Sequence, residues 1–386
     1  MTEQAAAPQH LEGIRVLDFS MYLAGPYATR LMADHGAEVI KVEPPTGDTL
    51  RSAPPNVGGK SRYFGHFNCG KKCIVVDLKD PEGIAAIKRL VADCDVLLEN
   101  FRPGVMKRLG LDYESMKAIK PDLIYCSVSG YGQIGSASHR PAFAAVVHAG
   151  SGYDMVQYGY SRGLDRPPRN RSTAGDILAA THAFGAVCAA LFRRARAGLG
   201  ERIDVTMIDS MHNLTAWELQ ASQVENPDDP IVFEPVRTAD GFLMAAPVSL
   251  ANFKAMATAI GREDWLADER YTSVDGRRQR WGEIMAELET WTLSRTSAEA
   301  EAIIQQAGCP CTRYQTIGES FTEPHVDERG AARIVDNGTG PFRVANAPMR
   351  YESVDVGCRP WVADLGAHNA EILGQSASPA ARGPDD

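Results

Sequence analysis

The 386-residue sequence predicts an α/β protein built on a parallel sheet. In the N-terminal half of the chain, short β-branched apolar segments alternate with segments of helical pattern, which is the order of repeated βαβ units. Parallel strands need a crossover connection, usually a helix, so this alternation favours a parallel sheet over an antiparallel meander. The chain also exceeds the length at which one hydrophobic core stops growing, and we expect two domains or one elaborated domain.

The first βαβ unit is the clearest of these. Residues 13–19 have the β-branched, apolar content of a strand, and residues 37–43 form the next strand. Between them Pro26 begins a helix, because proline is tolerated at the first helical position, and Gly36 ends it. The turn before this helix lacks the glycine pattern of a dinucleotide site, so an oxidoreductase with a ribose-binding acid at Glu43 is disfavoured.

Further strands follow, and polar or glycine-containing loops come after them. The predicted strands are residues 73–78, 94–99, 123–129 and 202–208, with helices between them. Residues 100–104 and 130–132 are the loops after two of these strands. Ligands of open α/β sheets bind at the carboxyl ends of the strands, so we expect these loops and the loop after residue 19 to share one ligand-binding edge.

A long apolar segment begins after Asp176 and continues to Phe192, where arginines and Gly198 mark the end of a helix. A helix that is apolar on nearly every side is expected to be buried. Asp176 lies at or next to the N-cap, where a carboxylate accepts hydrogen bonds from free backbone N–H groups. Asp176 is therefore either a simple cap or an ionised carboxylate beside a dry core, available as a nucleophile.

The rest of the chain is less regular. Residues 225–325 read as a smaller second domain, with a short strand at residues 241–246 and helical pieces between residues 252 and 290. From residue 331 onward, Gly/Pro turns alternate with short strands, and residues 376–386 read as a loose tail.

Composition disfavours several classes of protein. A formal net charge of −9 disfavours nucleic acid as a partner. No uninterrupted apolar run reaches about 18 residues, so no membrane span is predicted. The eight cysteines are scattered without zinc-site spacing, so we expect no metal and reduced thiols in a cytoplasmic protein. The first ten residues are polar and alanine-rich, unlike a signal peptide.

Motifs spread along the chain add a more specific signal. They are residues 11–19, 24–26, 36–43, 77–83, 95–104, 130–132, 175–176, 308–311 and 366–373. In their order and coverage these segments resemble the class III CoA-transferase family, which includes formyl-CoA transferase and carnitine CoA-transferase.

The resemblance implies a Rossmann-like large domain formed by residues 1–224 and 326–386, a smaller α/β domain at residues 225–325, and two identical chains interlocked as a homodimer. It also implies acyl-CoA and a small carboxylic acid as substrates, with coenzyme A carried between acids and no metal or redox cofactor. The family's nucleophilic aspartate falls on Asp176. Its CoA-contacting loops fall on Tyr22, Leu23, Ala24, Leu78, Lys79, Asn100, Phe101, Arg102, Arg108, Ser129, Gly130 and Tyr131.

Two departures from the family's pattern bear on the reaction. The related acyl-CoA racemases use a His–Asp pair, and Phe143 occupies the position of their histidine. The glycine loop that closes over the site in formyl-CoA transferase is not found near residues 225–245, which argues against formyl or oxalyl substrates. His148 and His182 are interpreted as structural residues.

Three functions stay open on this basis. They are CoA transfer between two acids, racemisation or intramolecular CoA migration on an acyl-CoA, and CoA binding without catalysis.

Four arginines precede Asp176 in a proline-interrupted loop: Arg162, Arg166, Arg169 and Arg171. They form either a solvated loop or a clamp for a second carboxylate on the substrate.

Overall fold

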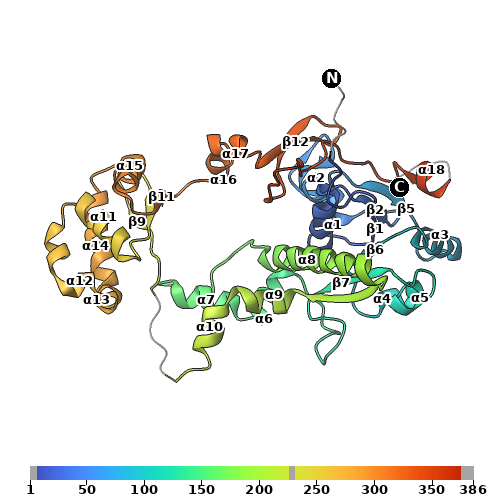
Figure 1. Ribbon diagram of the computed structural model, residues 1–386, viewed down its shortest axis with the longest axis horizontal. Helices are drawn as coiled ribbons and strands as arrows, with labels where there is room; N and C mark the ends of the chain where they lie inside the picture. Colours follow the sequence, from blue (N-terminus) through green and yellow to red (C-terminus); the bar gives the residue numbers. More distant parts are fainter. Residues whose placement is uncertain (1–6, 226–230, 375–386) are drawn as a thin grey trace, which may run out of the picture. The chain divides into compact units, whose positions relative to one another are not determined.

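The computed structural model describes residues 7–225 and 231–374, and the predicted tail at residues 376–386 lies outside this part of the chain. The chain divides into two compact units (Figure 1). The first unit consists of Met1–Gln223 together with His325–Asp386, and the second is Val224–Pro324.

The first unit is built on a six-stranded parallel sheet with the strand order β5-β2-β1-β6-β7-β8. Its strands are β1 (Arg15–Asp18), β2 (Glu38–Glu43), β5 (Lys72–Val75), β6 (Val96–Glu99), β7 (Ile124–Ser129) and β8 (Glu201–Thr206). The predicted α/β fold with a parallel sheet is therefore confirmed. The strands near the centre are buried along almost their whole length, because helices cover both faces.

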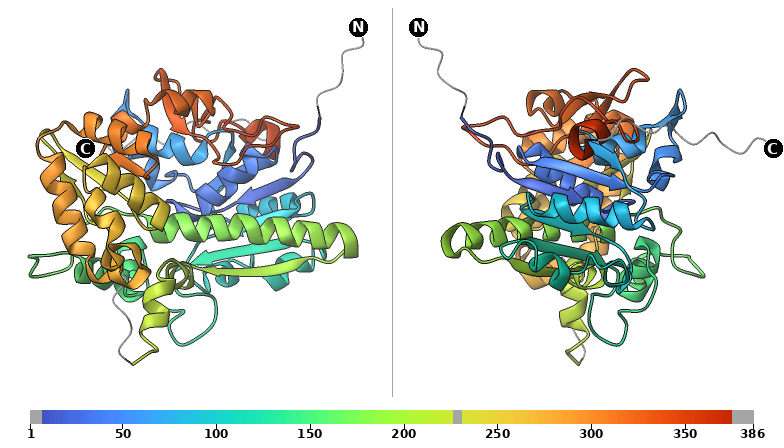
Figure 2. Two further views of the ribbon diagram at one scale, coloured as in Figure 1. Left: turned by 60° about the vertical axis from the view of Figure 1, so that its left-hand side comes forward. Right: turned by 90° about the vertical axis from the view of Figure 1, so that its right-hand side faces the viewer.

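Neighbouring residues of one strand point to opposite faces of this sheet, so Val16 joins one hydrophobic core and Leu17 the other. Helices cover both faces of the sheet (Figures 1 and 2). One face is covered by α1 (Ala24–Asp34), α6 (Ala144–Gly150), α8 (Ala174–Ala197) and α9 (Met207–Leu214). The other face is covered by α3 (Pro81–Val91), α4 (Val105–Arg108), α5 (Tyr113–Lys117) and α18 (Asn369–Leu373).

The remaining elements of the first unit lie outside this three-layer arrangement. They are η1 (Thr49–Ser52), β3 (Asn56–Val57), β4 (Lys60–Ser61), α2 (Arg62–Asn68), α7 (Tyr153–Tyr160), α10 (Ala216–Ala221), α17 (Pro324–Glu328), β12 (Ala332–Asp336) and β13 (Pro341–Ala345). Strands β12 and β13 form an antiparallel hairpin, and apolar residues of this hairpin pack against Cys69 at the end of α2.

The second unit has its own core beside an antiparallel sheet of β9 (Val236–Arg237), β10 (Phe242–Ala245) and β11 (Cys311–Arg313). Its helices are α11 (Leu250–Ala259), η2 (Glu263–Ala267), α12 (Glu269–Thr272), α13 (Val274–Gln279), α14 (Trp281–Thr292), α15 (Ser297–Ala307) and α16 (Ile317–Ser320). The indole of Trp265 is stacked between Phe253 and Tyr271, with ring centroids 5.9 and 4.9 Å away.

Two helices begin earlier than the sequence predicts. Helix α1 begins at Ala24 instead of Pro26, and proline is tolerated at the third position because the first four N–H groups of a helix have no partner within it. Helix α9 begins at Met207, and the Thr206 hydroxyl accepts a hydrogen bond from the Asp209 N–H. The cap is therefore Thr206, and the helix takes up the last two residues of the strand predicted at residues 202–208.

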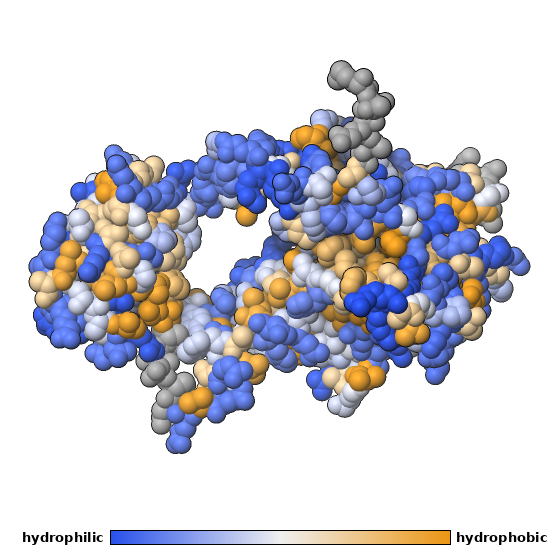
Figure 3. Space-filling view, viewed as in Figure 1, coloured by the Kyte–Doolittle hydropathy of each residue, from blue (hydrophilic) through white to orange (hydrophobic). Residues whose placement is uncertain are grey.

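The prediction that α8 is buried on all sides is wrong for the single chain. One side packs against the sheet and against α1 and α9, but Thr181, His182, Gly185 and Ala189 are exposed on the helix, and Phe192 exposes 65% of its surface. Apolar side chains accordingly gather over this helix on the visible surface (Figure 3). Small apolar residues occupy both sides of α8, so hydropathy does not distinguish the packed side from the exposed one.

Helix α8 is also, within residues 7–225 and 231–374, the one helix whose length and hydropathy would suit a membrane span. Core helices of soluble proteins pass the same test, so this finding is weak support for a span.

A buried ion pair ties the end of β1 to two other segments. Asp18 is fully buried and accepts hydrogen bonds from the Ser20 N–H at 2.9 Å and the Thr29 hydroxyl at 2.6 Å. The Lys71 Nζ lies 3.0 Å from an Asp18 oxygen. Burial by itself raises the pKa of Asp18, but the charges of Lys71 and Lys41 together with these hydrogen bonds outweigh burial and hold the pKa below its usual value. The carboxylate is therefore ionised at neutral pH.

Replacing Lys71 by methionine should destabilise the first unit strongly. Loss of one partner from a buried ion pair costs about 3–5 kcal/mol, because the other charge stays out of water. We expect Lys71→Met to lower the free energy of unfolding in urea by roughly that amount. Lys72→Met is the matched control, because Lys72 pairs with Glu38 near the surface and such pairs contribute about 0.2–1 kcal/mol. Equal losses in the two variants would contradict this account.

Candidate functional site

The carboxyl ends of the parallel strands lie at one edge of the sheet, and the strand order reverses there. The chain proceeds outward from β1 to β2 and β5, then returns to β6 beside β1 and continues to β7 and β8. In open α/β sheets, ligands bind in the crevice at such a switch point. The loops after β1 and β6 therefore frame the candidate site, on the edge that the sequence predicts.

The loop after β1 has an unusual backbone that the loop after β6 holds in place. Tyr22 adopts φ of 63°, a conformation that non-glycine residues rarely adopt. The Asn100 side chain accepts a hydrogen bond from the Met21 N–H at 2.9 Å and donates one to the Met21 carbonyl at 2.7 Å. A Cβ at Gly25 would lie 2.2 Å from the Ser20 Cβ, so only glycine lets α1 begin this close to the loop.

Other predicted CoA contacts lie in the loops after β5 and β6 and at the end of α4. Leu78 and Phe101 are partly buried and pack against one hydrophobic core. Lys79, Arg102 and Arg108 are exposed, and none of them forms an ion pair with another described residue. These three cations are therefore available to an anionic ligand at this edge.

The loop after β7 carries the last group of predicted contacts. The Ser129 hydroxyl accepts a hydrogen bond from the Gly132 N–H at 3.0 Å. A Cβ at Gly130 would lie 2.4 Å from the Ala142 Cβ, so glycine permits the close approach of the segment that leads into α6. Tyr131 is half-buried beside this contact.

Asp176 is the third residue of α8, and of the two interpretations of this residue the structure does not support the simple cap. The N-cap residue is Thr173, and within the described part of the chain no group donates a hydrogen bond to the Asp176 carboxylate. Burial raises the pKa of Asp176 from its ordinary 3.8 to about 6. The structure thus presents a partly buried carboxylate whose lone pairs are not engaged.

His148 takes the capping role at this helix end. Its Nε2 accepts a hydrogen bond from the Gly175 N–H at 3.1 Å, so this nitrogen carries no proton. The side chain is fully buried, and burial lowers the pKa of His148. The structural interpretation of His148 agrees with this geometry. His182 Nδ1 lies 3.0 Å from the Ser210 hydroxyl, which is a structural contact as well.

Tyr63 is a site residue that the sequence analysis missed. It lies on α2 and packs in the same hydrophobic cluster as Leu23 and Ile177, the residue that follows Asp176. Burial and the negative charge of Asp176 raise the pKa of Tyr63, whereas the positive charge of Arg171 lowers it. The phenol therefore lies near both charged groups. No motif marks α2, so this neighbour could be found only from the fold.

Phe143 connects the loop after β1 with the start of α8. Its ring meets the Tyr22 ring edge to face, with the centroids 5.5 Å apart. Phe143 is the N-cap of α6, the helix that carries His148, and His148 in turn holds the backbone next to Asp176. A continuous set of contacts therefore joins Tyr22 to the nucleophile candidate.

The four arginines of the loop before α8 differ in their surroundings, although all of them are exposed. Arg166 pairs with its neighbour Asp165 at 2.8 Å, which is a local surface contact. Arg171 is the member whose charge acts on Tyr63. The loop is thus mainly solvated, but its last arginine reaches the surroundings of Asp176.

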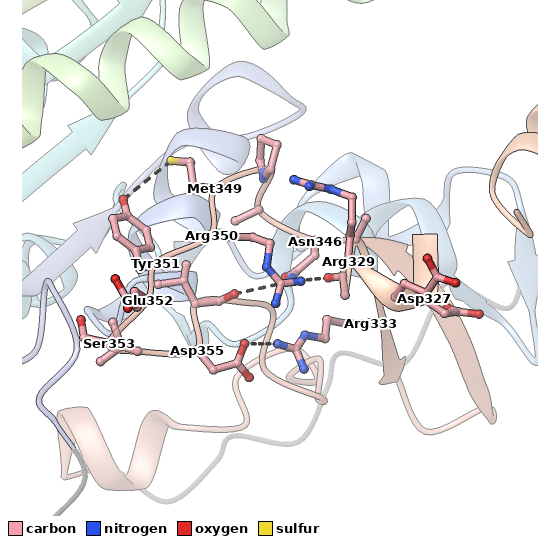
Figure 4. Close-up of a pocket in the computed structure, with 17 residues that line it drawn as sticks. Asp327, Arg329, Arg333, Asn346, Met349, Arg350, Tyr351, Glu352, Ser353 and Asp355 are labelled. Atoms are coloured by element: carbon pink, nitrogen blue, oxygen red, sulfur yellow. Dashed lines mark hydrogen bonds and ion pairs between the residues drawn. The ribbon is translucent and has the colours of Figure 1, made fainter. Parts of the chain in front are cut away.

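An open cavity of about 680 Å³ adjoins Tyr63. It is mainly apolar and is lined by Arg62, Tyr63, His66 and Phe67 of α2 together with residues of the β12–β13 hairpin. A separate groove of about 620 Å³ lies along the C-terminal segment between residues 327 and 356, and none of the predicted site residues lines it (Figure 4). Among the described residues, no group of three His, Cys, Asp or Glu is placed to hold a metal ion.

A parallel α/β sheet with polar loops gathered at its switch point and an unpaired carboxylate near a helix start is an arrangement suited to ligand binding and nucleophilic chemistry. The chain matches CoA-transferase family III over residues 11–369, and it belongs to this family.

Named CoA-transferases of this family are similar to the protein over nearly its whole length. The chain is 31% identical to the succinate–glutarate CoA-transferase of Agrobacterium fabrum, with 97% of this chain and 98% of the relative covered. It is 32% identical to the acetyl-CoA:oxalate CoA-transferase of Acetobacter aceti, with coverage of 99% and 100%. The crystal structure of Rv3272 from Mycobacterium tuberculosis is similar with a TM-score of 0.82 at 31% identity, covering 95% and 99% of the two chains.

The raised pKa of Asp176 predicts that its ionised carboxylate destabilises the fold at neutral pH. The native state binds this proton more tightly than the unfolded state, so stability falls as the pH rises from 3.8 to about 6, and the loss is complete above that pH. Each pKa unit corresponds to about 1.4 kcal/mol, and attraction by the helix N-terminus offsets about 0.3–1 kcal/mol. Asp176→Asn should therefore be more stable than the wild type by about 1–3 kcal/mol near neutral pH.

Urea unfolding of both proteins at about pH 7 and about pH 3 measures this difference, which should vanish at the lower pH. Asp165→Asn is the control, because that carboxylate is exposed and its partner Arg166 lowers its pKa, so its removal should give no gain. An Asp176→Asn variant that is less stable than the wild type at neutral pH would show that the carboxylate has partners that stabilise it.

Proposed function

We propose that the protein transfers coenzyme A from an acyl-CoA thioester to a free carboxylic acid, with Asp176 as the nucleophile. The observation that carries this proposal is the partly buried Asp176 carboxylate, which has a raised pKa and receives no hydrogen bond within the described chain. Membership of CoA-transferase family III supplies the class of reaction. A carboxylate that is poorly solvated and unpaired keeps its lone pairs available for attack.

The proposed reaction alternates anhydrides and thioesters. An Asp176 oxygen attacks the donor carbonyl, the C–S bond breaks, and CoA thiolate leaves a mixed anhydride. The thiolate then attacks the Asp176 carbonyl, which forms an aspartyl-CoA thioester and releases the donor acid. The acceptor carboxylate attacks this thioester, and the released thiolate attacks the acceptor carbonyl of the second anhydride. The product acyl-CoA leaves and Asp176 is regenerated, with no net oxidation.

Each attack places negative charge on a carbonyl oxygen, which needs a hydrogen-bond donor. At the start of α8 the Gly175 N–H already donates to His148, and the Ala174 N–H donates to the Ser172 hydroxyl. Burial and the negative charge of Asp176 raise the pKa of Tyr63, so its hydroxyl stays protonated and able to donate a hydrogen bond. We therefore assign oxyanion stabilisation to Tyr63.

Binding of the CoA moiety is assigned to the predicted loops at the switch-point edge. The three unpaired cations Lys79, Arg102 and Arg108 suit the phosphates of CoA. The two hydrogen bonds between the Asn100 side chain and the Met21 backbone hold the neighbouring Tyr22 in its rare backbone conformation, so Tyr22 is in place before the ligand arrives. Pre-organised contacts of this kind reduce the entropy that binding removes.

The racemase alternative lacks a suitable base. Phe143, at the position of the racemase histidine, is an apolar residue packed on Tyr22. The nearby His148 cannot replace that histidine, because its Nε2 is bound to the Gly175 N–H and its ring is fully buried. Transfer between two acids is therefore favoured over racemisation.

A dicarboxylic acid is the acceptor that the charges around Asp176 favour. The positive charge of Arg171 acts on Tyr63, so we assign Arg171 to a remote carboxylate of the substrate while the other carboxylate reacts at Asp176. The relatives from Agrobacterium fabrum and Chloroflexus aurantiacus are named for succinate, glutarate and D-citramalate, all of which are dicarboxylates.

We also propose that the active form is an interlocked homodimer. The exposed side of α8 supports this, together with the exposed side chains of Phe192 at 65% and Trp217 at 46%. Apolar surface of this extent on one unit marks an interaction surface.

Asp176→Asn should lose CoA transfer while remaining folded, because an amide is a poor nucleophile of similar size. Succinyl-CoA and acetyl-CoA, each tested with a panel of acids, provide the assay. In the wild type, kcat/KM should fall about tenfold per pH unit below about pH 6 and level off above it, since only the ionised carboxylate attacks. Near-normal turnover of the variant would refute the mechanism. CoA binding without any aspartyl thioester in the wild type would instead favour a non-catalytic homologue.

Arg171→Lys should reduce kcat/KM for succinate selectively, because lysine keeps the charge but cannot form the paired hydrogen bonds of arginine. Such a pair contributes about 1.5–3 kcal/mol, so we expect a loss of roughly ten- to hundredfold relative to butyrate. Arg166→Lys serves as the matched control, since Arg166 is engaged by Asp165 on the surface. An unchanged ratio of succinate to butyrate in Arg171→Lys would remove Arg171 from the substrate site.

Interlocked chains cannot separate without unfolding, so the dimer should persist on dilution. Sedimentation velocity at nanomolar concentration checks this expectation. A folded monomer under those conditions would contradict the interlocked arrangement.

A further inference from the structure

The open cavity beside Tyr63 combines apolar walls with positive charge. Its lining comes from α2, from the β12–β13 hairpin and from one proline, and includes the cations Arg62 and Arg343. No aspartate or glutamate occurs among the described residues that line it. Aromatic rings, including those of Phe67 and Phe342, form much of the remaining surface. A ligand in this cavity would therefore meet an apolar surface and cations without facing acids.

The close packing of α2 against the hairpin shapes this cavity. Helix α2 begins at Arg62, and His66 follows one turn later on the same side of the helix. Between them, a Cβ at Gly65 would lie 2.7 Å from the Cζ atom of Phe342. The absence of a side chain at Gly65 thus lets the Phe342 ring approach the helix directly. Arg62 and Phe342, which are distant in the sequence, consequently share one cavity wall.

Arg62 is the cation of this lining whose charge is not balanced. Its guanidinium carbon lies 5.4 Å from the centre of the Phe342 ring, and its Nε is buried without a hydrogen-bond partner. Within residues 7–225 and 231–374 its side chain forms no ion pair. Arg343, by contrast, pairs with Asp327 at 2.8 Å. A buried donor without an acceptor costs free energy, so the cavity favours a ligand that accepts a hydrogen bond from Arg62.

His66 adds no positive charge to the cavity at neutral pH. Burial and the charge of Arg30 lower the pKa of His66 to about 4, so its ring is neutral. In the described lining, Arg62 is then the one cation without an ionic partner. A ligand with one negative charge balances it, whereas a dianion would leave excess charge in mainly apolar surroundings.

We propose that this cavity binds a free monocarboxylic acid with an alkyl or aromatic body. The carboxylate would pair with Arg62, because a planar guanidinium matches the geometry of a carboxylate, and the body would lie against the Phe342 ring. The cavity volume of about 680 Å³ is within the range of small-molecule sites, about 300–1,000 Å³. This site is separate from the one assigned to Arg171, and the inference does not depend on CoA transfer.

Isothermal titration calorimetry of the full-length protein without acyl-CoA, with hexanoate as the probe, tests the proposal. Hexanoate should bind at least about tenfold more tightly than acetate, because each buried methylene contributes roughly fourfold in affinity. Hexan-1-ol lacks the charge and inorganic phosphate lacks the apolar body, so each should bind at least about tenfold more weakly than hexanoate. Absence of hexanoate binding, or equal affinity for any of the three comparison compounds, would overturn the proposal.

A pair of arginine variants tests the assignment of the carboxylate. Arg62→Met keeps an apolar stem and removes the charge, so hexanoate affinity should fall roughly ten- to hundredfold. Arg343→Met is the matched control in the same lining, because Arg343 is already engaged by Asp327, and affinity should change by less than about twofold. Equal losses of affinity in the two variants would refute the assignment to Arg62.

Two further variants locate the site without relying on Arg62. Ile334 lines the cavity and exposes 57% of its surface, so Ile334→Glu should fold. The new negative charge repels a carboxylate, and hexanoate affinity should fall at least about tenfold. Arg171→Met should bind hexanoate as the wild type does. Loss of binding in Arg171→Met with unchanged binding in Ile334→Glu would place the acid at the proposed reaction site and refute this one.

Discussion

The arrangement of the site rests on the ion pair between Asp18 and Lys71. Asp18 ends β1 beside the switch point, and a carboxylate can be fully buried there only because a cation and hydrogen-bond donors surround it. Its partners come from the loop, from α1 and from the segment after α2, so one carboxylate links elements that are distant in sequence. The loop that begins at Ser20 therefore has little freedom, and Tyr22 keeps its rare backbone conformation next to Asn100.

Asp176 is a second carboxylate of the same unit, and its surroundings are the opposite of those of Asp18. Burial acts on both groups, but Asp18 has cations and donors that lower its pKa, whereas Asp176 has none in the described chain and its pKa rises to about 6. The first carboxylate is satisfied and structural. The second receives no hydrogen bond from the described chain, while His148 caps the helix in its place, and this is the state that the proposed nucleophile requires.

The family fold and the choice of acid depend on different parts of the chain. Relatives with about the same identity to this protein, 31% and 32%, are named for glutarate and for oxalate. The family fold is therefore compatible with different acids, and under the proposed mechanism substrate preference would depend on the few side chains around Asp176. Tyr63 on α2 and Arg171 in the loop before α8 are the candidates that the structure offers for this role.

The sequence by itself determined the βαβ order, the parallel sheet, the shared edge of the loops and Asp176 as the nucleophile candidate, because hydropathy period, turn residues and motif order are local properties. It did not reveal that His148 caps α8 or that the charge of Asp176 acts on Tyr63. It also predicted a fully buried α8, because small apolar residues on both sides hide which side packs. Only the tertiary structure decided these features, since each depends on contacts between segments whose separation in the chain carries no local signal.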